Sequence, residues 1–215
     1  MTLPDLEFEK RLHKKGFKLI AGVDEVGRGC FAGPVATGCV VLGDPGFEVL
    51  RLKSPLIDDS KKLSQKQREI ADRWIRKNAV AYGIGTASVI QINKLGIKKA
   101  TEIAFRKAIK NCKVQIDYLL IDAFYIPYVK GLRRKNQKAI VKGDTKSVSI
   151  AAASIVAKVY RDKLMVGLSK NPKYKKYKWY KNKGYGTKEH REIIRKYGIS
   201  RLHRKQFVET WLSKV

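Results

Sequence analysis

The chain has 215 residues, of which 47 are Lys or Arg and 19 are Asp or Glu, so its formal net charge at pH 7 is +28. Hydrophobic residues make up 44%, enough for an ordinary globular core, which excludes a wholly disordered protein. No apolar run reaches the roughly 20 residues needed to cross a bilayer, and the acidic segment 1–9 does not resemble a secretory signal, so we expect a cytoplasmic protein.

The sequence alternates between strand and helix patterns up to about residue 170. Apolar runs bounded by turn residues predict strands, and these lie at 18–24, 34–42, 79–85, 118–122 and 139–141. Between them, apolar residues at helical spacing predict helices over 65–78 and 95–111, the first of them behind the N-cap Ser64. Such alternation is typical of an α/β fold, in which helices pack against a central sheet.

A long helix is predicted over 148–168, and its early face consists almost entirely of small residues. Small side chains bring helix and sheet backbones close together, so we expect this helix to pack directly on the core. Beyond it follow a basic, aromatic-rich segment at 173–185, a helix over 187–197 and a short helix ending near Leu212. We therefore predict one sheet domain over 1–170, with a basic helical extension over 171–215 packed on it as one functional unit.

The positive charge is concentrated in the C-terminal part of the chain. Residues 1–122 contain 22 basic and 14 acidic residues, whereas residues 123–215 contain 25 basic and 5 acidic ones. A field of this sign attracts phosphate polymers, so nucleic acid is the favoured partner. A lysine-rich solvated surface without a partner has the same composition, and composition alone does not separate the two.

The three cysteines, Cys30, Cys39 and Cys112, show no C-x-x-C spacing and are odd in number. They suggest neither a disulfide framework nor a zinc site, and we expect reduced, buried thiols. The three histidines, His13, His190 and His203, are scattered without ligand spacing, so we assign them no role.

Carboxylates in this acid-poor chain stand at the ends of predicted strands. Asp24 and Glu25 follow one strand, Asp122 closes another and Asp144 lies just past a third. Carboxylates that converge at one sheet edge repel each other unless a cation neutralises them, and all-oxygen ligands suit Mg²⁺ or Mn²⁺. A pair of such ions can clamp the attacking water and the leaving oxygen of a phosphodiester. Taken singly, each acid can instead be a strand-end cap or an ion-pair partner.

Two further segments carry possible ligand contacts. Gly27-Arg28-Gly29 matches neither G-x-G-x-x-G nor G-x-x-x-x-G-K-S/T and precedes a strand, which excludes a nucleotide cofactor. Its glycines nevertheless let the backbone approach a ligand such as a ribose hydroxyl. A plain tight turn explains the same glycines. In segment 173–185, cations for phosphates alternate with rings that can stack on sugars or bases, unless those rings face the core.

These motifs together resemble one family, type 2 ribonuclease H (ribonuclease HII). Segment 21–29 with 32–35 resembles its N-terminal signature, and 58–64 resembles its D-S-K-K-L loop. The stretches 142–144 and 149–162 resemble its K-G-D and S-I-A-A-A-S-I-x-A-K-x-x-R-D motifs, and 183–190 continues the match. The motifs run in family order from about residue 18 to 207.

The resemblance implies a ribonuclease H-like mixed five-stranded sheet flanked by helices. It also implies an endoribonuclease that cuts the RNA strand of RNA–DNA hybrids, and cuts 5′ to ribonucleotides embedded in duplex DNA during ribonucleotide excision repair. The implied mechanism uses two metal ions and leaves 5′-phosphate and 3′-hydroxyl ends.

The resemblance also assigns residue roles. Asp24, Glu25, Asp122 and Asp144 fall on the family's catalytic, metal-binding acids, which hold Mn²⁺ or Mg²⁺. The substrate-binding positions are Gly27, Arg28 and Gly29 for the ribose 2′-OH, Tyr185 for the next sugar and Lys61 for a phosphate. Only the 2′-OH distinguishes an embedded ribonucleotide from DNA.

The chain departs from the family pattern in two places: Cys30-Phe31 replaces Pro-Leu, and the connection 124–138 is comparatively long and basic. A further acid, Asp162, stands beside Arg161 on the long helix, and we expect the two to form an ion pair. Arg28 and the short leader argue against the type 3 enzymes, which carry a lysine there and an additional N-terminal domain.

We expect a monomer without membrane contact; whether a replication clamp recruits it is left open. Two other hypotheses remain. One is a non-catalytic basic RNA-binding protein in which the acids are structural, and the other is a nuclease of the same superfold that ignores the 2′-OH.

Overall fold

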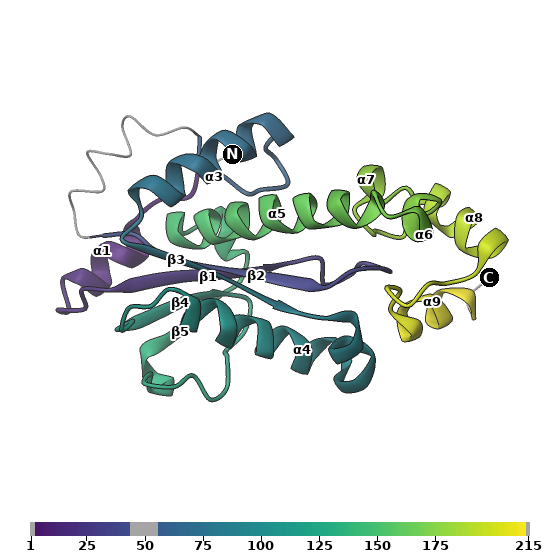
Figure 1. Ribbon diagram of the computed structural model, residues 1–215. Helices are drawn as coiled ribbons and strands as arrows, with labels where there is room; N and C mark the ends of the chain where they lie inside the picture. Colours follow the sequence, from purple (N-terminus) through teal and green to yellow (C-terminus); the bar gives the residue numbers. More distant parts are fainter. Residues whose placement is uncertain (1–2, 44–55, 214–215) are drawn as a thin grey trace.

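The computed structural model describes residues 3–43 and 56–213 (Figure 1). Its centre is a five-stranded sheet in the order β3-β2-β1-β4-β5. The strands are β1 Ile20–Val26, β2 Val35–Val41, β3 Ala81–Ala87, β4 Tyr118–Asp122 and β5 Gln137–Ile140. The first three pair antiparallel, whereas β4 and β5 join them parallel to β1, which confirms the mixed five-stranded α/β sheet.

Helices cover both faces of the sheet. The helices are α1 Glu7–His13, α3 Gln65–Asn78, α4 Val89–Asn111, α5 Val148–Ser169, α6 Pro172–Lys175, α7 Trp179–Asn182, α8 Lys188–Tyr197 and α9 Lys205–Leu212. In Figure 1, α3 and α5 lie over one face, α4 lies under the other, and α6 to α9 gather at one end. None of the described helices is long and apolar enough to cross a membrane.

The small-residue face of α5 lies directly on β1 and β2. A Cβ added at Gly22 would lie 2.1 Å from the carbonyl carbon of Ser149, and one at Gly38 would lie 2.2 Å from the carbonyl oxygen of Ala153. Neither strand position therefore has room for a side chain, and the expectation of close helix–sheet packing is confirmed. This packing places the first turns of α5 against β1, the strand that carries Asp24.

Several element boundaries differ from the predicted ones. Strand β1 continues to Val26, two residues beyond the predicted end at Asp24, so Glu25 also lies within the strand. Helix α4 begins at Val89, behind a Ser88–Gln91 capping box and before the predicted start at 95. It is interrupted at Gly96, whose φ of +78° is not helical. Helix α1 was not predicted at all. The three cysteines are free and buried, as expected.

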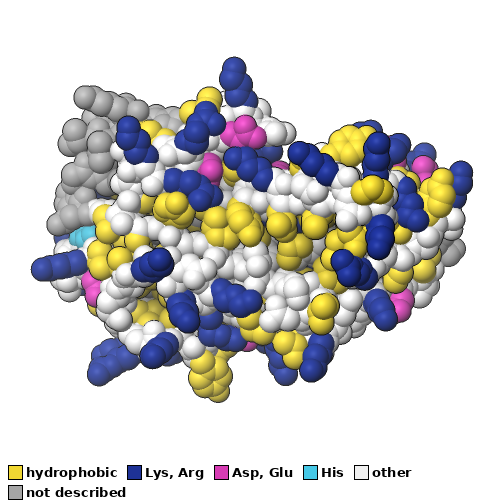
Figure 2. Space-filling model, in the orientation of Figure 1, with side chains coloured by type: hydrophobic (Ala, Val, Ile, Leu, Met, Phe, Trp, Pro, Cys, Tyr) yellow, Lys and Arg dark blue, Asp and Glu magenta, His cyan; other side chains and the backbone are white. Residues whose placement is uncertain are grey.

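The aromatic segment 173–185 packs largely inward. Tyr174, Tyr177 and Trp179 are 5%, 2% and 0% exposed and form a cluster with Ala32 and Met165, so the expectation that these rings stack on nucleic acid is wrong. The rings are buried because α6 and α7 need an apolar face to pack on α5. The lysines stay outside, and Figure 2 shows many basic and few acidic side chains on the visible face. The division of the chain at residue 170 stays a prediction.

Candidate active site

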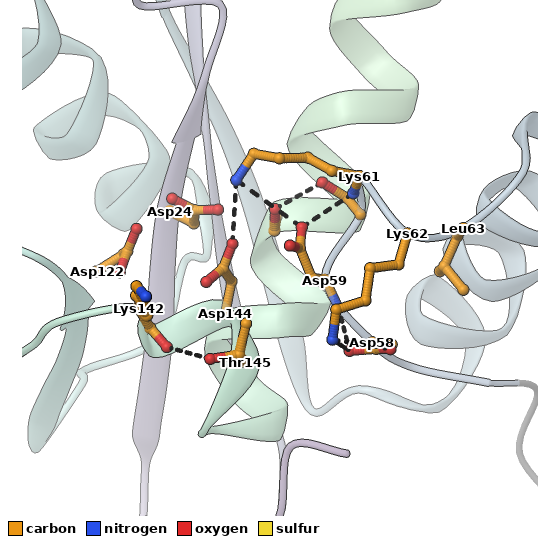
Figure 3. Close-up of polar contacts among 12 residues, drawn as sticks. Asp24, Asp58, Asp59, Lys61, Lys62, Leu63, Asp122, Lys142, Asp144 and Thr145 are labelled. Atoms are coloured by element: carbon orange, nitrogen blue, oxygen red, sulfur yellow. Dashed lines mark hydrogen bonds and ion pairs between the residues drawn. The ribbon is translucent and has the colours of Figure 1, made fainter. Parts of the chain in front are cut away.

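The sheet topology brings the four predicted acids to one place. Asp24 lies on β1, and Asp122 is the last residue of the neighbouring parallel strand β4. Asp144 lies in the 3₁₀ turn Gly143–Thr145, which follows β5 and precedes α5. Figure 3 shows these three carboxylates directed toward a common space. Glu25, next to Asp24, completes a group that we call the acid cluster.

The acid cluster has few hydrogen-bond donors of its own. Asp24 Oδ1 accepts from the amide of Glu25 at 2.7 Å, and Asp122 Oδ1 accepts from the amide of Gly143 at 2.7 Å. Glu25 Oε1 lies 3.4 Å from Arg28 Nη1. Glu25 Oε2 is buried and has no hydrogen-bond partner among the described residues. A buried carboxylate oxygen without a donor is costly. Glu9 Oε2, outside the cluster, also lacks a partner among the described residues, so Glu25 Oε2 supports a cation position only together with the acids that converge on it.

Burial and mutual repulsion disfavour the ionised acids. Burial raises the pKa of Asp24 well above its ordinary value, and the charges of Glu25, Asp122 and Asp144 raise it further. Burial also raises the pKa of Glu25, against the opposing effect of Arg28. Burial, reinforced by Asp144, raises the pKa of Asp122. A divalent cation would remove this repulsion, and the all-oxygen donor set suits a hard ion.

The ammonium group of Lys61 lies beside one acid of the cluster. Its ammonium lies 3.3 Å from Asp144 Oδ2 and 3.8 Å from Asp59 Oδ1 (Figure 3). Burial lowers the pKa of Lys61, but the charges of Asp144 and Asp59 outweigh this and raise it overall. No three His, Cys, Asp or Glu side chains within 3–43 and 56–213 are arranged to hold a metal ion together. Lys61 therefore engages Asp144, where the resemblance implied a substrate phosphate.

One pocket of about 590 Å³ joins the acid cluster to the other predicted contacts. Asp24, Glu25 and Asp122 line it together with Gly27, Arg28, Gly29, Lys61 and Tyr185. Asp144 is not among the lining residues and reaches the site through its contact with Lys61. The pocket also exposes residues that the sequence analysis missed: Val26, Ser60, Arg68, Ser154 and Lys158. The four-residue spacing of Ser154 and Lys158 on one helix face was the available signal.

The loop 27–34 is hydrogen-bonded to a buried arginine, Arg161. Gly27 has φ +80°, and a Cβ there would lie 2.0 Å from Arg161 Nε, so the tight-turn explanation of this glycine also holds. Arg161 donates to the carbonyls of Ala32, Pro34 and Lys183 at 2.9–3.1 Å. The predicted ion pair of Arg161 with Asp162 is wrong, because Asp162 pairs with Lys158 at 2.9 Å, one turn back on α5.

Tyr185 stands at the other side of the pocket. Burial raises the pKa of its phenol to about 12, so the hydroxyl stays protonated at neutral pH. The Nζ of Lys158 lies 5.4 Å from the centre of its ring. Cys30 is fully buried, and Phe31 packs on Ile194 and Val208, so both substituted loop positions are accommodated by packing.

Two buried histidines support the segment that carries Tyr185. The amide of Ser200 donates to His203 Nδ1 at 2.9 Å, so the ring proton of His203 lies on Nε2, 3.2 Å from His190 Nε2. His190 Nδ1 then donates to the carbonyl of Tyr185 at 2.8 Å. Both rings are neutral in this chain, and burial lowers the pKa of each, that of His203 to about 3.

A buried glutamate supports the turn that carries Asp144. Glu9 is 4% exposed, and its Oε1 accepts from the hydroxyls of Ser147 and Ser149, each at 2.6 Å. Ser147 is the N-cap of α5, so Glu9 fixes the helix start from another part of the chain. The sequence analysis missed Glu9 because it lies on α1, a helix that was not predicted.

Comparison with known proteins adds an independent observation. The family model described as Ribonuclease HII matches residues 21–210. The chain belongs to the ribonuclease HII family. A ribonuclease HII of Caldanaerobacter subterraneus subsp. tengcongensis is 47% identical over 202 residues, covering 94% of this chain and 79% of that protein. That of Bacillus subtilis is 46% identical over 200 residues, covering 93% and 73%.

Solved structures agree with the fold. The ribonuclease H2 of Pyrococcus horikoshii OT3 gives a TM-score of 0.71 at 24% identity, covering 91% of this chain and 98% of its own. Archaeoglobus fulgidus ribonuclease HII, solved in complex with PCNA, gives 0.70 at 26% identity over 86% and 93%. Bst-RNase HIII, solved with Mn²⁺, gives 0.71 at 20% identity over 94% and 71%.

Family membership establishes the coarse activity. The protein is a metal-dependent ribonuclease H of type 2, a hydrolase that acts on RNA–DNA hybrids. The assignment of particular residues to metal, phosphate and ribose stays a prediction, which the geometry of the pocket supports.

Proposed function

We propose that this ribonuclease HII cuts RNA–DNA hybrids and also cuts 5′ to single ribonucleotides in duplex DNA, by a two-metal mechanism that leaves 5′-phosphate and 3′-hydroxyl ends. One observation carries the proposal. Asp24, Glu25 and Asp122, with their raised pKa values and with Glu25 Oε2 lacking a partner among the described residues, line the same pocket as Gly27, Arg28, Gly29 and Tyr185.

Asp24, Glu25, Asp122 and Asp144 would hold the divalent ions once Lys61 leaves Asp144 and the carboxylates draw together around them, because no three of the described His, Cys, Asp or Glu side chains are arranged to hold an ion as they stand. When bound, such ions lower the pKa of an attacking water and stabilise the charge that develops on the phosphodiester oxygens. The Mn²⁺ of Bst-RNase HIII supports manganese as one candidate, and the oxygen ligands suit Mg²⁺ equally. Lys61 is 78% exposed at its side chain, so it can leave Asp144 for a substrate phosphate when a metal ion neutralises that carboxylate.

The remaining lining residues bind and orient the nucleic acid. Arg28 and Lys158 place positive charge at the pocket wall, where phosphates of the cleaved strand would lie. Gly29 carries no side chain, and a Cβ there would meet nothing within 4 Å, so its backbone stays accessible to a ribose 2′-OH. The protonated Tyr185 presents a flat ring for the neighbouring sugar.

The setting of this activity is part of the proposal. We place the enzyme in the cytoplasm as a monomer that initiates ribonucleotide excision repair. The solved complex of A. fulgidus ribonuclease HII with PCNA supports a sliding clamp as a recruiting partner for this chain as well.

The deciding experiment compares three end-labelled substrates: a DNA duplex with one ribonucleotide, the same duplex in all-DNA form, and single-stranded RNA. Each is incubated with Mg²⁺, Mn²⁺ or a chelator. We expect a metal-dependent cut 5′ to the ribonucleotide and no cut in all-DNA. Cutting of all three would retain the metal site and discard ribose recognition by the 27–29 segment. Binding without any cut, in either metal, would support a non-catalytic RNA-binding protein instead.

A further inference from the structure

A buried guanidinium lies directly beneath the proposed ribose-reading segment. Arg204, at the N-cap of α9, is 0% exposed. Its Nη2 donates to the carbonyl of Gly27 and its Nη1 to the carbonyl of Arg28, both at 2.7 Å. Its Nε donates to the carbonyl of Gly33 at 3.0 Å. One side chain from the C-terminal end therefore fixes both ends of the loop 27–34, 170 residues or more away in sequence.

A second buried guanidinium connects this loop to the segment carrying Tyr185. Arg161, also 0% exposed, donates to the carbonyls of Ala32 and Pro34 and to that of Lys183, two residues before Tyr185. Neither arginine forms an ion pair within the described part of the chain. Each guanidinium instead donates to backbone carbonyls, and its rigid planar shape fixes where those carbonyls lie.

We propose that Arg204 is a positioning residue for ribose recognition, which holds the Gly27 and Arg28 carbonyls so that the loop above it distinguishes a ribonucleotide from a deoxyribonucleotide. The inference rests on the proposed function. Arg204 touches neither the acid cluster nor the pocket surface, so it acts only through the backbone that it holds. Discrimination by a 2′-OH contact needs a loop fixed to within a fraction of an ångström, because a displacement of about 1 Å can cost up to 10²-fold.

Lysine is the informative replacement, since it keeps the charge and much of the volume but cannot donate to three carbonyls in the plane of a guanidinium. The test variant is Arg204→Lys, and Arg161→Lys tests the same scaffold from the Tyr185 side. The matched control is Arg201→Lys, three residues away, whose guanidinium donates to the Tyr174 hydroxyl at 2.7 Å and does not contact the loop. Thermal unfolding identifies which variants remain folded.

The measurement is the ratio of affinities for a DNA duplex with one ribonucleotide and for the same all-DNA duplex, by fluorescence anisotropy with Ca²⁺ in place of Mg²⁺. We expect Arg204→Lys to lower this ratio about tenfold, with all-DNA affinity within about twofold of wild type. Arg201→Lys should keep the wild-type ratio. If Arg204→Lys fails to fold, the same affinity ratio is measured on Arg161→Lys, and we expect it to fall there as well.

Two results would overturn the inference. A folded Arg204→Lys protein with the wild-type ratio, or one that loses affinity equally for both duplexes, would leave Arg204 a purely structural residue. A wild-type ratio of one would instead contradict the proposed function itself, and this inference with it.

Discussion

The molecule contains a buried cluster of acids and a buried pair of arginines, and the two differ in how their polar atoms are hydrogen-bonded. In the acid cluster, burial and repulsion raise the pKa values of Asp24, Glu25 and Asp122, and one carboxylate oxygen has no donor among the described residues. Arg161 and Arg204 are buried at least as deeply, yet each donates to three backbone carbonyls. The arginines therefore complete the protein's own scaffold, whereas the acids lack such partners, which supports the proposal that they bind a cation.

The largest expected effect follows from removing one acid. Asp24→Asn should lower cleavage by about 10³-fold or more, because a neutral amide binds a divalent ion poorly and several kcal/mol of stabilisation are lost. Without metal, its melting temperature should equal or exceed that of wild type, since a buried, repelled carboxylate is gone. Initial rates on a hybrid and thermal unfolding in chelator measure both. Retention of activity would discard the metal assignment.

For the buried arginines we expect the reverse, a loss of stability with little change in metal affinity. Arg161→Met keeps an unbranched apolar side chain but removes the guanidinium, which leaves the carbonyls of Ala32, Pro34 and Lys183 without their donor. We expect the free energy of unfolding to fall by about 3–5 kcal/mol, measured by urea denaturation. Metal affinity, followed by Mn²⁺ titration of the folded protein, should change little. A stable Arg161→Met protein would show that the carbonyls find other partners.

Substitutions at Gly27 and Gly29 distinguish a glycine that the loop conformation requires from one that is proposed to contact the ligand. Gly27→Ala should cost about 2 kcal/mol or more, because φ is +80° and the new Cβ would meet Arg161. Gly29→Ala meets nothing within 4 Å, so stability should change by less than about 0.5 kcal/mol. Its cleavage at a single ribonucleotide should nevertheless fall about tenfold, if the 2′-OH approaches the backbone there. Equal activity of Gly29→Ala and wild type would place the ribose elsewhere.

The last effect concerns pH and develops gradually over several pH units. The folded-state pKa of His203 is lowered to about 3, so its neutral form contributes stability above the ordinary value of 6.5, and this contribution is lost as pH falls. The slope is at most about 1.4 kcal/mol per pH unit between those values. The acid cluster titrates in the opposite sense, so the contribution is measured as the difference between wild type and His203→Gln. Parallel stability curves from pH 7 to pH 4 would contradict the lowered pKa.

The acids and the arginines also differ in how far sequence could anticipate them. Asp24, Glu25, Asp122 and Asp144 each interrupt or follow an apolar strand pattern, and local pattern suffices to single them out in an acid-poor chain. Glu9, Arg161 and Arg204 carry no such mark, because an isolated charged residue in a basic sequence predicts a solvated surface. The ion pair predicted between Arg161 and Asp162 failed for another reason: residues adjacent in a helix point to different faces, and Asp162 pairs with Lys158 instead.

The sequence by itself determined the α/β alternation, the close packing of α5 and the family, since these depend on local periodicity and on contiguous motifs. Only the tertiary structure decided that Lys61 meets Asp144, that His190 and His203 share a hydrogen bond, and that three rings of segment 173–185 are core. Lys61 and Asp144 are 83 positions apart and the two histidines 13, and the buried rings cluster with Ala32, which is 142 positions before Tyr174. Their partners are chosen by how strands and helices stack in space, and this information is not local in the chain.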